Sequence, residues 1–305
     1  MKPTALATPQ TSAVPAVKAR LRDYAELLKL RLSALSVMTA LFGYFAAVPA
    51  FSWTVVVALM VGSSLAAGGA AAINQVMERE EDALMRRTSA RPLPAGKLSR
   101  AEALALGLGS SLLGSVVLFA VCGWLAGTLA AMTVGIYALL YTPMKKRSEF
   151  ATEIGAIAGA LPPLIGWAAA GTSSLFVGYY LFAILFIWQI PHFMSISWLY
   201  REDYARGGFA MLAIHDVTGD LVARRALLYS ILLCVVAPLP AVTGEATWLY
   251  GILALAVSLW MAVGGRRFKY PERRREAART LFLRTLAYLP VLLLLFALDR
   301  LFFLV

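Results

Sequence analysis

Cysteine and histidine are almost missing from this chain, with two of each in 305 residues. Cys122 and Cys234 both lie in apolar surroundings, and no CxxC or paired Cys/His spacing is present. The sequence therefore predicts neither a structural disulfide nor a zinc site. A Ser/His/Asp or Cys/His arrangement for nucleophilic catalysis is not evident either. Any catalytic chemistry must then depend on other polar side chains.

Acidic residues are also few. The 17 aspartates and glutamates are outnumbered by 28 lysines and arginines, so the formal net charge is +11. Hydrophobic residues make up 60% of the chain and the mean hydropathy is +0.73, whereas soluble domains contain roughly 45–50% apolar residues. This composition predicts an integral membrane protein. The basic residues gather between apolar runs, so we interpret them as a membrane-orientation signal rather than a nucleic-acid interface.

Long apolar runs organise the chain, and each is close to the roughly 20 residues that a membrane-crossing helix needs. The runs cover residues 32–50, 54–77, 101–121, 124–142, 151–171, 175–199, 223–243, 246–264 and 281–303. We therefore expect an all-α membrane protein with nine transmembrane helices. The connections alternate between short, nearly uncharged segments and longer, basic ones.

The distribution of basic residues predicts the orientation. With nine spans, every lysine and arginine except Arg300 falls on one side, which the positive-inside rule makes cytoplasmic. The amino terminus is then cytoplasmic and the carboxyl terminus extracytoplasmic. Residues 1–20 lack the features of a signal peptide and are expected to be a disordered tail. Residues 21–305 are expected to form a single domain, with two related four-helix halves and a ninth helix.

A polar stretch follows the second apolar run. Asn74, Glu78 and Asp82 are four residues apart, which places their side chains on one face of a helix. Oxygen ligands of this kind suit Mg²⁺, which is commonly bound by one or two carboxylates together with phosphate oxygens. Arg87 and Arg91 follow, and their forked guanidinium groups can pair with phosphate. The pattern favours a site for a magnesium diphosphate, although a charged loop that anchors the membrane topology would also explain it.

A second polar cluster follows the sixth run. Glu202 and Asp203 are candidate metal ligands, and Tyr204 is placed to bond a phosphate. His192 lies deep in the apolar run, where an ionisable residue is a functional candidate. On one continuous helix, His192 and Asp203 would share nearly one face. His215 lies in the following loop and is a weaker candidate.

The basic loop YTPMKKRSEF contains Lys145, Lys146 and Arg147. These residues would either contact the diphosphate or only enforce the orientation of the chain, and the sequence does not separate the two roles.

Five motifs in this chain resemble a known family. The pattern NxxxExxxDxxMxRTxxRPL over Asn74–Leu93, with YTPxKKR, GALPPLIGW, WQIPHF and REDYARGG, is similar to the UbiA-type intramembrane prenyltransferase superfamily, and in particular to its protoheme IX farnesyltransferases. The resemblance extends over most of residues 25–225. It implies a helical bundle around a central cavity that opens toward the membrane, with an active site on the cytoplasmic side of the cell (inner) membrane.

The resemblance also implies a reaction. A farnesyl group would pass from farnesyl diphosphate to a vinyl group of haem B in a Mg²⁺-dependent step, giving haem O for terminal oxidases. Asn74, Glu78, Asp82 and the two trailing arginines match the first acidic motif, and Lys146 and Arg147 match the basic motif. Glu202 and Asp203 fall in the second acidic motif, but its usual DxxxD form is absent here. His192 matches a histidine that would ligate or orient haem, and His215 falls where some members carry a histidine.

Other functions remain open at this stage. The same acids would serve prenyl transfer to a quinone or to another tetrapyrrole precursor. A transporter for a lipophilic anion is disfavoured, because most charges lie at one membrane face. A non-enzymatic assembly factor for an oxidase is a further alternative. Besides the lipid bilayer, candidate partners are haem A synthase and oxidase assembly proteins.

Overall fold

The computed structural model describes residues 13–47, 51–171 and 174–303, and all regular secondary structure in these ranges is helical. In chain order the elements are α1 (Ala13–Leu27), α2 (Leu30–Ala47), α3 (Trp53–Met77), α4 (Arg79–Leu84), α5 (Arg100–Cys122), α6 (Trp124–Gly135), η1 (Ile136–Tyr141), α7 (Thr142–Met144), α8 (Ala151–Ala169), α9 (Leu175–Leu199), α10 (Arg201–Arg206), α11 (Leu212–His215), α12 (Asp220–Val236), α13 (Leu239–Val242), α14 (Trp248–Phe268), η2 (Pro271–Arg273) and α15 (Arg274–Phe303).

Eight helical segments within the described ranges are long and apolar enough to cross a membrane. They correspond to eight of the predicted apolar runs, and the last of them extends further toward the amino terminus than predicted. The run predicted at 151–171 forms α8, which packs against α2 and α9 inside the bundle. It is not among the eight, because Glu153 and its Gly and Pro residues make it less apolar. The all-helical, multi-span prediction is therefore confirmed, whereas a ninth span and the orientation stay predictions.

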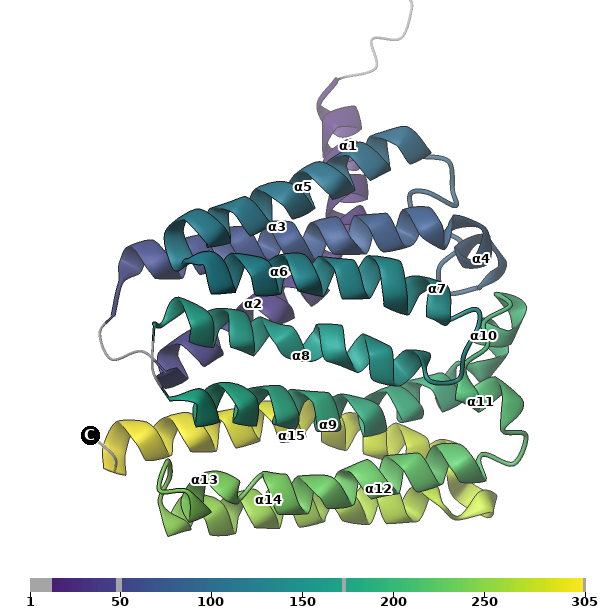
Figure 1. The fold of residues 1–305 in the computed structure, drawn as a ribbon. Helices are drawn as coiled ribbons and strands as arrows, with labels where there is room; N and C mark the ends of the chain where they lie inside the picture. The colour runs from purple at the N-terminus through teal and green to yellow at the C-terminus, as the bar shows by residue number, and fades with distance from the viewer. Residues whose placement is uncertain (1–12, 48–50, 172–173, 304–305) are drawn as a thin grey trace, which may run out of the picture.

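The long helices lie side by side in a bundle, and the short helices α4, α7, α10 and α11 gather at one end of it (Figure 1). Small residues let neighbouring helices approach closely. A methyl group built on Gly166 of α8 would lie 1.7 Å from the carbonyl oxygen of Ala40 on α2. On α3, the same addition at Gly69 would lie 2.6 Å from the carbonyl oxygen of Gly107 on α5. Close backbone approach of this kind is typical of helix pairs in membranes.

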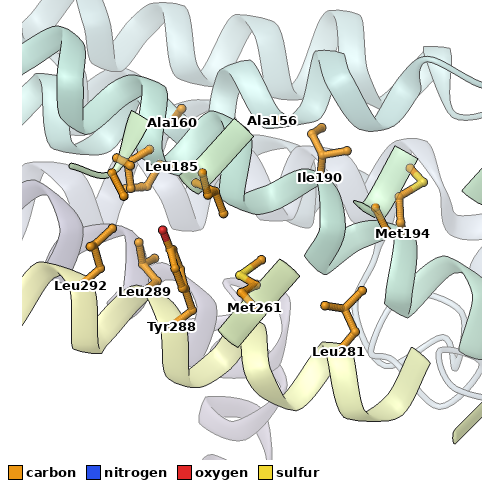
Figure 2. Packing of buried hydrophobic residues seen from close by; sticks show 14 of the residues in the cluster. Ala156, Ala160, Leu185, Ile190, Met194, Met261, Leu281, Tyr288, Leu289 and Leu292 are labelled. Carbon is orange, nitrogen blue, oxygen red and sulfur yellow. The ribbon is translucent and has the colours of Figure 1, made fainter. Parts of the chain in front are cut away.

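The second half of the bundle contains the largest buried apolar cluster. Figure 2 shows side chains of α8 and α9, among them Leu185 and Ile190, facing Leu281, Tyr288 and Leu292 of α15. This packing holds α9 and α15 together along much of their length. The position of α9 is thereby fixed, and with it the short helix α10 that follows.

Two expectations need correction. The predicted disordered tail over 1–20 is helical from Ala13, where an alanine-containing segment favours a helix, and residues 1–12 lie outside the described ranges. His192 and Asp203 do not share one helix. The helix α9 ends at Leu199, and Tyr200 leaves the helical region with φ −112° and ψ 19° before α10 begins.

Candidate active site

Three polar side chains form a buried row at the end of α3. Asn74, Glu78 and Asp82 are only 1%, 3% and 1% exposed. Although Glu78 separates α3 from α4, the amide of Glu78 donates to the Asn74 carbonyl at 2.9 Å, and the amide of Asp82 donates to the Glu78 carbonyl at 2.8 Å. The backbone therefore keeps its four-residue spacing through the junction. This spacing places the three side chains on one face, as the sequence predicts.

Each member of this row contacts a basic side chain from another part of the chain. Lys29, between α1 and α2, donates to Asn74 Oδ1 at 3.2 Å. Lys145, after α7, lies 2.8 Å from Glu78 Oε1, and Arg91 donates to Asp82 Oδ2 at 2.6 Å. Buried carboxylates are costly unless paired, so these contacts stabilise the row. They also gather three basic side chains around the row.

Burial and charge act together on the two lysines. Burial, together with the nearby charges of Arg91 and Lys145, lowers the pKa of Lys29 to about 7. Burial alone would also lower the pKa of Lys145, but the Glu78 carboxylate and the Tyr141 and Tyr137 hydroxyl groups together outweigh burial and raise that pKa. Lys145 therefore stays charged. A further negative charge beside Lys29 would raise the pKa of Lys29 and favour its charged form.

The second acidic cluster lies beside the first. Asp203 Oδ1 accepts from the backbone amide of Arg86 at 3.3 Å and forms an ion pair with Arg206. Arg87 donates to the hydroxyl of Tyr204 at 3.4 Å, and its guanidinium lies 5.3 Å from the ring centre of Tyr200. The connection after α4 therefore joins the two clusters at one end of the bundle (Figure 1).

The basic residues after α7 border the same region. Lys146 forms an ion pair with Glu81, next to the buried row. Arg147 and Lys146, with Met77, Thr142 and Pro143, line a pocket of about 150 Å³. Thr142 also accepts a hydrogen bond from Asn74 Nδ2 at 3.0 Å, so the pocket adjoins the row.

Three predicted site residues lie apart from this arrangement. Glu202 and His215 are exposed. His192 Nδ1 lies 2.8 Å from Thr285 Oγ1 on α15, and its ring stacks on Trp188 with the ring centres 5.1 Å apart. His192 therefore belongs to an aromatic group with Trp188, Phe193 and Phe282, where α9 contacts α15.

The side chains of the row have the oxygen ligands that magnesium prefers, but they do not form a complete coordination site by themselves. Among the residues that the structure describes, no three His, Cys, Asp or Glu side chains converge on one point. Asp82 Oδ1, however, is buried and has no hydrogen-bond partner in the described part of the chain. A free carboxylate oxygen one helical turn from a second carboxylate suits Mg²⁺, which takes its remaining ligands from water and phosphate.

Sequence reasoning missed two contributors to the row. Lys29 lies at the break between α1 and α2, where its φ of 46° is the only positive value among the described non-glycine residues. Its sequence context carried no separate signal, because Lys29 is one of several charged residues before the first span. Thr142 carried no signal, because only the tertiary packing of α7 brings it to Asn74.

The chain is similar to known proteins over most of its length. The model of the UbiA prenyltransferase family matches residues 36–287. The protoheme IX farnesyltransferase of Opitutus terrae is 44% identical over 291 residues, covering 95% of this chain and 99% of that protein. A solved structure of digeranylgeranylglyceryl phosphate synthase has a TM-score of 0.78 at 18% identity, covering 92% of this chain and 98% of that one.

A solved UbiA homologue from Archaeoglobus fulgidus, bound to GPP and Mg²⁺, has a TM-score of 0.63 at 15% identity and covers 89% of this chain and 99% of that one. At these identities the solved structures establish the fold alone. The family match and the full-length relative go further: the chain is a multi-pass membrane protein and belongs to the UbiA prenyltransferase family.

Proposed function

We propose that the chain transfers a farnesyl group from farnesyl diphosphate to a vinyl group of haem B, giving haem O for terminal oxidase assembly. The observation that supports this most directly is the buried row Asn74, Glu78 and Asp82 with its three basic partners. Such a row suits a metal-bound diphosphate. The protoheme IX farnesyltransferase name of the relative supplies the acceptor.

The diphosphate would bind at the polar end of the bundle. Arg91 and Lys145 already lie within ion-pair distance of the carboxylates, and a bound diphosphate would share them. Arg87 is held by Tyr204 and Tyr200 at the edge of the same region. Lys146 and Arg147 would contact the outer phosphate from their pocket. These cations stabilise the charge that grows on the diphosphate as its bond to the farnesyl group breaks.

Glu78 and Asp82 would hold Mg²⁺, and Asn74 lies on the same helix face. Asp203, or its exposed neighbour Glu202, would supply a ligand from the second acidic cluster. When bound there, Mg²⁺ would offset negative charge on the leaving diphosphate. The protein's own acids therefore position the charge-neutralising groups and need not act as nucleophiles.

The acceptor would lie further inside a central cavity of the bundle. His192 is fixed by Thr285 and by the Trp188 ring, and we assign it the role of orienting haem. The farnesyl carbon would leave with a positive charge as the diphosphate takes the bonding pair. The vinyl carbon then attacks it, and water adds to the resulting cation with loss of a proton, giving the hydroxyethyl group. Aromatic faces such as Trp188 and Phe193 favour the cationic species. His215, which is exposed, would act only at the entrance.

The architecture proposed for the membrane has nine spans, with α8 as the fifth. It has a cytoplasmic amino terminus, an extracytoplasmic carboxyl terminus, and an active site that faces the cytoplasm from the cell (inner) membrane. Within the single domain over 21–305, two related halves are supported by a shared pattern. Both α3 and α9 have 25 residues, and each leads into a helix of six residues that begins with Arg-Glu. Haem A synthase or an oxidase assembly protein would accept the product.

The test is a product assay. The purified protein in lipid nanodiscs is incubated with haem B, farnesyl diphosphate and Mg²⁺, and the porphyrins are analysed by mass spectrometry. A product with the mass of haem B plus a farnesyl group and a hydroxyl group is expected. Farnesylation of a quinone offered in parallel, with haem B unchanged, would contradict the proposal.

A further inference from the structure

A groove on the outside of the bundle lies between α14 and α15, away from the candidate active site. Ala256, Val257 and Trp260 of α14 and Ala287 and Val291 of α15 line it, and it encloses about 370 Å³. The two alanines present only methyl groups, which gives the groove its depth. Exposed apolar side chains surround it, including Leu253, Val263, Leu286 and Leu294. This face is therefore suited to lipid chains rather than water.

One end of the groove carries a positive charge. The guanidinium of Arg284 lies 4.9 Å from the ring centre of Trp260, and its Nη1 donates to the Trp260 carbonyl. Gly264 provides the space, since a methyl group there would lie 2.9 Å from Arg284 Cδ. The arginine is thus held against the groove by both partners instead of extending freely from the helix.

More basic residues continue from this end. Arg266 and Arg267 form the exposed last turn of α14, and Arg267 is close enough to Arg284 for their charges to repel. Within the described ranges, no carboxylate pairs with Arg266, Arg267 or Arg284. The nearby Arg274, in contrast, is paired with Asp220. Cations without a carboxylate partner, close enough for their charges to interact, favour an external anion.

The chemistry at the two ends of the groove identifies one occupant. We propose that the groove binds an anionic phospholipid, with one acyl chain along Ala256, Ala287 and Val291 and the phosphate beside Arg284 and Arg267. The α14–α15 connection lies at the same end of the bundle as α10 (Figure 1), and Arg267 belongs to the last turn of α14 next to this connection. In the proposed orientation this end is the basic membrane face, where an anionic headgroup would lie. A zwitterionic lipid would bring its own cation to the arginines and would bind more weakly.

Quenching of Trp260 fluorescence tests the proposal. The full chain is reconstituted in phosphatidylcholine nanodiscs that contain a minor fraction of phosphatidylglycerol, with brominated acyl chains on one lipid or the other. The contribution of Trp260 is obtained by difference from Trp260→Phe. We expect stronger quenching by the brominated phosphatidylglycerol. Equal quenching by both lipids would overturn the proposal.

Variants separate the headgroup contact from general surface charge. Arg284→Gln is expected to lower the preference for phosphatidylglycerol about fivefold, the scale of one basic residue at a membrane surface. Arg100→Gln removes the same charge from the exposed start of α5 and should leave the preference unchanged. If the two variants behave alike, no specific headgroup site exists.

Three further measurements complete the test. Arg267→Gln provides the headgroup readout if Arg284→Gln does not fold, and Ala287→Phe should reduce quenching by filling the groove without changing the charge. Soluble glycerol phosphate should not displace the brominated lipid. Its displacement by this anion alone would identify a free-phosphate site and contradict lipid binding.

Discussion

The ammonium nitrogen of Lys145 lies 2.8 Å from Glu78 Oε1, although 67 residues separate the two positions in the chain. Both side chains are largely withdrawn from solvent, and the Tyr141 ring centre lies 4.7 Å from the same nitrogen. The contact joins the end of α3 to the connection after α7. It therefore links the buried row of Asn74, Glu78 and Asp82 to the basic motif, through both packing and charge.

Replacing one member of this pair should destabilise the fold. Lys145→Met leaves Glu78 buried without its partner, and breaking a buried pair costs about 3–5 kcal/mol. The double variant Lys145→Met/Glu78→Gln should recover part of that loss, because no unpaired charge remains. The measurement is the free energy of unfolding in detergent. Lys146→Met is the control, since its partly exposed pair with Glu81 should contribute less than about 1 kcal/mol.

Arg91 should matter for diphosphate rather than for haem. Arg91→Ala removes the forked group beside Asp82, and we expect kcat/KM for farnesyl diphosphate to fall about a hundredfold. Haem affinity, measured by absorbance titration, should stay within about twofold, because the haem site proposed around His192 does not include Arg91. Arg86→Ala, whose exposed side chain follows the same helix, should be nearly silent. An equal loss of haem affinity in Arg91→Ala would contradict this separation.

The close approach of α2 and α8 can be tested at a single glycine. Gly166→Ala would place a methyl group against the Ala40 carbonyl, and overpacking typically costs about 1–3 kcal/mol. Gly135→Ala makes the same change on α6, where the added methyl meets open space. The midpoint of thermal unfolding should fall for the first variant and not for the second. Similar midpoints for both variants would contradict the close approach of α2 and α8 at Gly166.

His192 should act on the acceptor. Thr285→Val removes the hydrogen bond that fixes the imidazole, and we expect haem affinity to fall about tenfold. His192→Ala should lower it at least as much, while both variants bind a farnesyl diphosphate analogue normally. Binding of haem and of the analogue is measured separately. Unchanged haem affinity in both variants would remove His192 from the acceptor site.

Much of this arrangement could be predicted from local sequence patterns. The apolar runs indicated the helices because a membrane requires long apolar segments, and the spacing of Asn74, Glu78 and Asp82 indicated a shared face. Both patterns lie within short stretches of chain. They do not depend on how distant segments pack.

Contacts between distant segments could not be predicted in this way. The hydrogen bonds of Asn74 with Lys29 and Thr142 depend on the positions of the α1–α2 break and of α7 in the folded structure. The relation between His192 and Asp203 was predicted wrongly, because the backbone at Tyr200 ends α9 and no helix-breaking residue marks that point. Local propensity does not reveal a break that tertiary packing imposes.

The central claim is that Asp82 binds a metal-bound diphosphate, and calorimetric titration with a non-hydrolysable farnesyl diphosphate analogue tests it most directly. The protein in nanodiscs is titrated with and without Mg²⁺, alongside Asp82→Asn and the exposed neighbour variant Glu80→Gln. The account predicts Mg²⁺-dependent binding that Asp82→Asn loses by at least about tenfold and that Glu80→Gln retains. If a folded Asp82→Asn protein binds the analogue with unchanged affinity and unchanged Mg²⁺ dependence, Asp82 does not bind the metal-bound diphosphate.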